Sequence, residues 1–213
     1  MKKILAVGLT AAILSTAAYA RFIVGLEYAP VTWTKHKDTR ESSNGTSVSY
    51  DGDYEYQPVV LKVGFGNPLK LSGYGYYSRG DATVDDLPKD IPFVDSITET
   101  WNELGFGMKY GFPIASVEGL APFVRGGFGL TWSELDNAEG IIYDQDYLFG
   151  WNVKVGGGIS YLLARHFQFL TGVEYIYRRW QDMEFYYLNS SRSYTHKQKD
   201  RGAKLFIGLN FVF

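Results

Sequence analysis

The sequence predicts an all-β fold: an eight-stranded antiparallel up-and-down transmembrane β-barrel with short periplasmic turns and long extracellular loops. Three observations predict it: an N-terminal export signal, a two-residue alternation of apolar and polar positions, and connections that alternate between short and long. The 213 residues include 24 Gly and 17% aromatic residues, a composition that suits strands and tight turns.

The overall composition also excludes several kinds of protein. The chain has no Cys, which rules out disulfides, Cys-ligated zinc and thiol catalysis. Its formal charge of −2 argues against a nucleic-acid partner, because nucleic-acid binders are basic.

The first twenty residues have the pattern of a secretory signal peptide. Lys2 and Lys3 precede an apolar run over residues 4–14, and Ala18-Tyr19-Ala20 supplies a small-x-small cleavage site. The alternative, a membrane anchor, is disfavoured because the apolar run is too short to span a bilayer. We therefore expect a cleavable signal peptide over residues 1–20 and one outer-membrane β-barrel domain over residues 21–213.

Eight segments alternate with the period of a strand. At the C-terminus, Leu205, Ile207 and Leu209 share one face, while Lys204 and Gly208 lie on the other. Each segment is close to the length that crosses a bilayer when the strand is tilted. The predicted strands are residues 22–28, 58–65, 69–78, 102–112, 122–132, 151–161, 167–177 and 203–213.

One of these strands has an ambiguous pattern. In residues 69–78, Leu71 shares parity with Gly73 and Gly75, whereas Tyr74 and Tyr76 take the other face. The register is open between two parities, and a bulge is one explanation.

The connections between the predicted strands fall into two classes. The short ones are residues 66–68, 113–119 and 163–166, and the long polar ones are roughly 34–53, 79–97, 133–147 and 181–200. All five Trp lie beside long connections, as expected for an aromatic ring at a membrane interface.

The second face of the predicted strands is polar and would form the barrel lumen. It carries five cations and three anions. An eight-stranded barrel is only wide enough for side chains to fill, so these charges must pair with one another. The predicted lumen charge network is Glu27, Lys62, Glu103, Lys109, Arg125, Lys154, Glu174 and Lys204.

Three stretches of sequence resemble the small eight-stranded outer-membrane β-barrel family, the opacity-protein and porin-like group. Residues 121–129 (APFVRGGFG) are similar to its Pro-aromatic strand with a following Gly-x-Gly, and residues 155–161 (VGGGISY) to its Gly-rich strand. The end of the chain, Gly208-x-x-Phe211-x-Phe213, resembles the family's C-terminal assembly signal, although Phe206 stands where a polar residue is usual. The resemblance implies the outer membrane of a Gram-negative-type bacterium, and the assembly machinery as a partner of the strand ending at Phe213.

The sequence indicates no catalytic residue, no metal ligand set and no cofactor. The histidines His36 and His196 lie in predicted long loops, with Asp38 close to the first and Ser191, Ser193 and Asp200 close to the second, but no third orienting group of a triad is identifiable. We therefore expect a protein that is not an enzyme.

The last long loop is basic and is the candidate contact with lipopolysaccharide or another partner, since Arg and Lys pair well with phosphate. The alternative is a merely solvated loop tip. The candidate contact residues are Arg192, His196, Lys197, Lys199 and Arg201.

Three functional hypotheses follow. The leading one, which the family resemblance implies, is a non-enzymatic structural or adhesin-like surface protein whose extracellular loops meet an external ligand, with outer-membrane lipid around the barrel. The second is a narrow porin-like channel for small solutes or ions through the charged lumen. The third is a soluble exported barrel with an apolar interior, which is disfavoured because the apolar face points outward.

Overall fold

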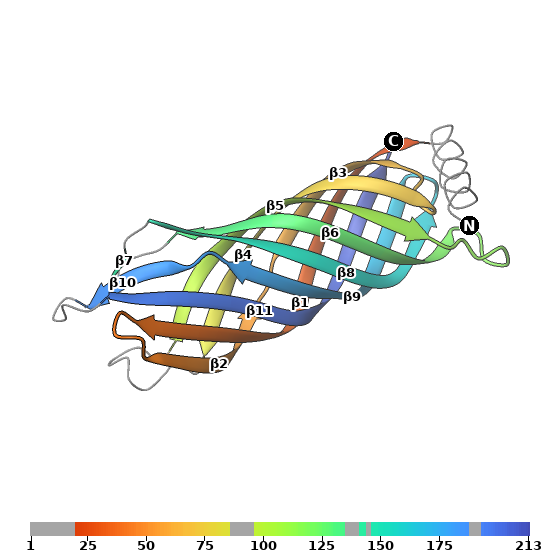
Figure 1. Ribbon diagram of the computed structural model, residues 1–213. Coiled ribbons are helices and arrows are strands. Elements are labelled where there is room, and N and C mark those ends of the chain that lie inside the picture. The colour runs from red at the N-terminus through yellow and green to blue at the C-terminus, as the bar shows by residue number, and fades with distance from the viewer. Residues whose placement is uncertain (1–19, 86–95, 135–140, 144–145, 188–192) are drawn as a thin grey trace, which may run out of the picture.

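A computed structural model gives the arrangement of residues 20–85, 96–134, 141–143, 146–187 and 193–213 (Figure 1). The expected signal peptide lies almost wholly outside these residues and stays a prediction. Within these ranges no helix is long and apolar enough to span a membrane. The strands are β1 (Arg21–Ser42), β2 (Ser47–Tyr56), β3 (Val59–Gly66), β4 (Leu71–Asp85), β5 (Ser96–Gly111), β6 (Leu120–Glu134), β7 (Ile141–Tyr143), β8 (Tyr147–Leu163), β9 (Phe167–Trp180), β10 (Met183–Tyr187) and β11 (Ser193–Val212).

Eight of these strands form a closed antiparallel ring in the order β1-β3-β4-β5-β6-β8-β9-β11, and β11 pairs with β1 to complete it. Closure removes the sheet edges that would otherwise leave backbone groups unpaired in a bilayer. Each ring strand overlaps one of the eight segments predicted from alternation, with bounds that agree to within two residues at the periplasmic ends, so the predicted fold class is confirmed.

The remaining strands lengthen the ring at one end. β1 pairs with β3 over Arg21–Tyr28 and with β2 over Thr34–Glu41, so β2 continues the place of β3 in the wall. The two are separated at Pro58, which has no N–H to donate, and its carbonyl accepts a 3.2 Å hydrogen bond from the Ala29 amide at a register shift in β1. β10 extends β9 in the same way beside β11, and Figure 1 shows β2, β7 and β10 gathered at the end opposite the C-terminus.

Two of the predicted long loops are therefore wrong. Residues 34–53 form the C-terminal part of β1 and most of β2, and a tight turn with Gly45 at φ 85° joins the two strands. Residues 181–200 are largely β10 and the start of β11. Strand pairing continues beyond the apolar band, but there the outward face is polar, while the lumen face carries buried aromatic side chains such as Tyr54 and Tyr56. The centres of the other two predicted loops lie outside the described residues.

The lipid-facing and lumen-facing sides follow the predicted parity. Outward side chains such as Leu26, Leu61 and Phe106 are about half exposed or more, while inward ones are buried. The ambiguous segment is a regular strand: Tyr76 and Ser78 point into the lumen, and β4 pairs with β3 without a register shift.

The prediction of five interfacial tryptophans is wrong for two of them. Trp33 and Trp151 face outward with 60% and 39% exposure, whereas Trp101 and Trp180 are buried inside the barrel at 3% and 2%. Trp180 follows the outward-facing Arg179, so its parity directs it into the lumen.

Close packing in the lumen allows a test by glycine substitution. A methyl group added at Gly172 would lie 2.2 Å from the Gly157 carbonyl oxygen and 2.9 Å from the Phe206 ring, whereas one added at Gly73 meets nothing within 4 Å. We predict that Gly172→Ala lowers the free energy of unfolding by about 1–3 kcal/mol and that Gly73→Ala leaves it nearly unchanged. Urea unfolding in lipid vesicles measures both, and equal effects would contradict the packing described.

Candidate functional site

The centre of the lumen is held by Arg125 of β6, which bridges two carboxylates. Its Nε donates to Glu174 Oε1 of β9 at 2.8 Å, and its Nη1 donates to both oxygens of Glu27 of β1 at 2.9 Å. Lys62 Nζ of β3 lies 2.5 Å from Glu27 Oε1, and Lys204 Nζ of β11 lies 3.1 Å from Glu174 Oε2. Five strands of the ring are thus joined through one guanidinium.

A third carboxylate, Glu103 of β5, lies at the centre of a second group of contacts. It accepts hydrogen bonds from the Tyr76 hydroxyl and from Lys154 Nζ, the latter at 2.5 Å. Arg178 Nη2 of β9 is 3.7 Å from its other oxygen, and Arg178 Nη1 is 3.8 Å from Asp200 Oδ2 of β11. Ion pairing therefore continues from the centre of the lumen toward the β2 and β10 end.

The periplasmic end is closed by backbone rather than by charge. The turn between β3 and β4 turns inward at Pro68, whose carbonyl accepts from Lys109 Nζ at 2.6 Å and from Gln168 Nε2 at 2.5 Å. Asn210 Nδ2 in turn donates to Gln168 Oε1 at 2.9 Å. Lys109 is thus held at the mouth of the barrel by a carbonyl.

The structure places all eight predicted lumen residues inside the barrel, each 8% exposed or less. Seven of them belong to ion pairs with one another, and Lys109 instead binds the Pro68 carbonyl. Sequence reasoning missed Arg178 and Asp200, because one lies just past a predicted strand and the other in a predicted loop. Strand parity, extended past residue 177, would have found Arg178.

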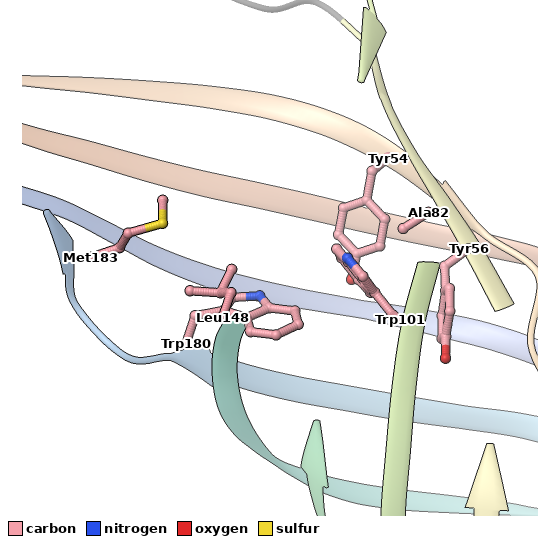
Figure 2. Close-up of a cluster of buried hydrophobic side chains, with 7 residues drawn as sticks. All are labelled: Tyr54, Tyr56, Ala82, Trp101, Leu148, Trp180 and Met183. Carbon is pink, nitrogen blue, oxygen red and sulfur yellow. The ribbon is translucent and has the colours of Figure 1, made fainter. Parts of the chain in front are cut away.

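An aromatic cluster fills the extracellular part of the lumen. Trp101 lies between Tyr54 and Trp180, with ring centroids 5.0 and 5.1 Å away, and Tyr56 is 5.3 Å from it (Figure 2). The Arg178 guanidinium lies 4.5 Å from the Trp101 ring centroid. Aromatic faces attract a desolvated cation, and here they compensate for its long contacts to Glu103 and Asp200.

Phe206, which departs from the usual C-terminal pattern, is a lumen residue with 0% exposure. The Arg125 guanidinium carbon lies 3.6 Å from its ring centroid, and the Phe123 ring is 6.3 Å away. An aromatic ring at this position supports the central arginine, which a small polar side chain would not do.

Two histidine–carboxylate pairs join neighbouring strands in the extracellular part of the barrel, beside the aromatic cluster. His36 Nδ1 is 2.6 Å from Asp200 Oδ1, which lies opposite it in register, and Asp200 also accepts from Trp180 Nε1 at 2.7 Å. His196 pairs with Asp38. Each histidine thus meets the aspartate that the sequence places near the other histidine.

The predicted basic loop is not a loop in the structure. Lys197, Lys199 and Arg201 lie on β11 and face outward, whereas His196 points inward toward Asp38. Arg192 lies outside the described residues. The alternation of a strand therefore splits the predicted cluster between the two sides of the wall.

The central arginine gives a sharp stability test. We predict that Arg125→Met lowers the free energy of unfolding by about 3–5 kcal/mol, because Glu27 and Glu174 lose their shared partner while remaining buried. The matched control is Lys197→Met, which removes an exposed 2.9 Å pair with Glu41 and should have no measurable effect. Equal midpoints for Arg125→Met and the unsubstituted protein in urea titrations would show that the network contributes nothing.

His36 provides a pH-dependent test. Burial lowers its pKa, but the hydrogen bond and charge of Asp200 outweigh burial, so its pKa lies above the ordinary value of 6.5. The pair is therefore fully stabilising below pH 6.5 and weakens as the pH rises through the raised pKa. An NMR titration of the imidazole should show the raised pKa and its fall in Asp200→Asn. An unchanged pKa in that variant would contradict the pairing.

Comparison with known proteins agrees with this architecture. The family model for the outer membrane protein beta-barrel domain matches residues 4–196. No curated protein matches the sequence. Among solved structures, OprG from Pseudomonas aeruginosa is 14% identical, with a TM-score of 0.56 over 91% of this chain and 95% of that one. Neisserial surface protein A is 16% identical, with a TM-score of 0.50 over 90% and 97%.

These two structures are less than 25% identical in sequence to this chain, so the similarity shows the fold alone. The family match, in contrast, covers most of the sequence, and it agrees with the closed ring of β-strands and the outward apolar band. The chain belongs to the outer membrane protein beta-barrel domain family and resides in the outer membrane of a Gram-negative-type bacterium.

Proposed function

We propose that this protein is a closed, non-enzymatic barrel that anchors an extracellular surface for contact with external partners. The observation that carries the proposal is the filling of the lumen at three levels. The Pro68 turn occupies the periplasmic end, the Arg125 network occupies the centre, and the rings around Trp101 occupy the extracellular part.

The spaces between these groups support a closed lumen. A cavity of about 30 Å³ lies beside Lys62 and Lys109, and one of about 10 Å³ lies beside Tyr76 and Lys154. Such volumes hold one or two water molecules at most, far less than a hydrated ion or a solute requires. In this proposal the charges in the lumen join strands to one another, and the narrow channel stays the second hypothesis.

The extracellular end supports a surface role. The β1–β2 hairpin and the β10–β11 pair extend the wall with hydrogen-bonded strands beyond the apolar band. A paired backbone presents side chains at fixed positions, which lowers the entropic cost of binding a partner. This paired extension takes the place of two of the four long loops predicted from the sequence as part of the candidate contact surface.

The histidines support a structural role and not a catalytic one. His36 is held by Asp200, whose second oxygen already accepts from Trp180. His196 likewise faces Asp38 inside the wall. Cross-strand pairs of this kind hold the extracellular part of the barrel together, whereas a general base must reach a substrate.

We also propose that the strand ending at Phe213 is read by the assembly machinery, and that residues 1–20 are removed on export.

Planar-bilayer recording of the protein purified from outer membranes tests the closed lumen. We expect no discrete openings from the unsubstituted protein, with incorporation verified by its tryptophan emission. The comparison variants are Lys62→Ala, Glu103→Ala and Arg125→Ala, each of which removes one lumen charge. Discrete openings of the unsubstituted protein that these variants alter would reject the proposal and establish the channel instead.

A further inference from the structure

A compact group of cations lies on the outer wall, directly above the apolar band. Lys37 of β1, Lys199 of β11 and Arg179 of β9 are paired in register across three neighbouring strands, and all three are exposed. In the adjacent row, Lys35 pairs with Arg201. These five residues, here called the wall patch, occupy two rows on adjoining strands.

The wall patch begins where the lipid-facing surface ends. The next outward row toward the periplasm is Trp33, Ala203 and Tyr175, which is apolar and aromatic. Aromatic side chains mark the level of lipid headgroups at a membrane interface. The five cations therefore lie at the height of the charged headgroups of the outer leaflet.

The wall patch carries an excess of positive charge, although Asp51 lies opposite Lys37 and Asp53 lies opposite Lys35 on the neighbouring β2. Like charges directly opposite each other on paired strands destabilise a sheet, and here three cations follow one another across two strand pairs. Within the described residues, none of the five has a carboxylate oxygen within ion-pair distance. The five cations of the patch thus outnumber the two acids opposite them, and the other nearby acids are Asp182 after β9 and Glu41, which pairs with Lys197.

We propose that the wall patch binds the phosphate groups of lipopolysaccharide in the outer leaflet. Phosphate matches the patch because Arg and Lys donate charge-assisted hydrogen bonds to its oxygens. Two rows of cations across three strands can contact more than one phosphate of the same headgroup. The site is independent of whether the lumen conducts, and it differs from the predicted loop cluster in that β1 and β9 supply three of its five cations.

The test measures binding of bisphosphorylated lipid A to the purified protein in detergent, by native mass spectrometry or calorimetry. The patch variant is Lys37→Gln/Arg179→Gln/Lys199→Gln. The matched control is Lys70→Gln/Arg79→Gln/Arg165→Gln, which removes the same charge from exposed cations outside the patch. Circular dichroism and heat-dependent gel mobility verify that both variants are folded.

We expect the patch variant to bind lipid A roughly a hundredfold more weakly, from three cations at an anionic surface. The control should stay within about threefold of the unsubstituted protein, because its cations lie outside the patch. Enzymatically dephosphorylated lipid A should bind the unsubstituted protein as weakly as lipid A binds the patch variant. Equal losses in the two triple variants would show non-specific attraction and overturn the site, as would unchanged binding by the patch variant.

Discussion

Eight strands enclose a lumen too narrow to hydrate the charges that point into it, so each inward charge has to meet an opposite charge or a polar group of the protein. Arg125 satisfies this constraint for two carboxylates at once, and Glu27 and Glu174 each accept a lysine as well. Because the partners come from five different strands, the ion pairs tie the ring together across its diameter. Removing Arg125 leaves each of the two buried carboxylates with one lysine in place of two cations.

The same constraint explains the features at both ends of the lumen. Toward the periplasm, Lys109 finds a carbonyl at Pro68, so the turn between β3 and β4 is drawn into the barrel. Toward the outside, Arg178 has long contacts to carboxylates and is instead surrounded by aromatic rings, which makes Trp101 and Trp180 lumen residues. The outer wall follows a different rule, since lipid selects apolar side chains up to Trp33 and charged ones such as Lys35 and Lys37 immediately above it.

The part of the fold that crosses the bilayer could be predicted from the sequence, because lipid on one side and a polar lumen on the other impose alternation on residues such as those around Leu205. Above the bilayer the outward face no longer meets lipid and is polar, so the apolar outward pattern ends although the strands continue, and the sequence predicts loops where β2 and β10 lie. The eight lumen charges were found by parity, but their partners were not, since pairing depends on which side chains meet across the barrel. Arg125 and Glu27, for example, are 98 residues apart. Trp180 lies beside a connection, as an interfacial residue would, but its parity on β9 directs it into the lumen.

Solid-state NMR of the protein in lipid bilayers can measure the central contact directly, through dipolar coupling between the Arg125 guanidinium nitrogens and the side-chain carboxyl carbons of Glu27 and Glu174. Direct hydrogen bonds at 2.8–2.9 Å between nitrogen and oxygen predict strong coupling to both carboxylates at once and slow exchange of the guanidinium protons with water. Weak coupling together with rapid exchange would mean a hydrated lumen with separated charges, and would contradict the view that ion pairing closes this barrel.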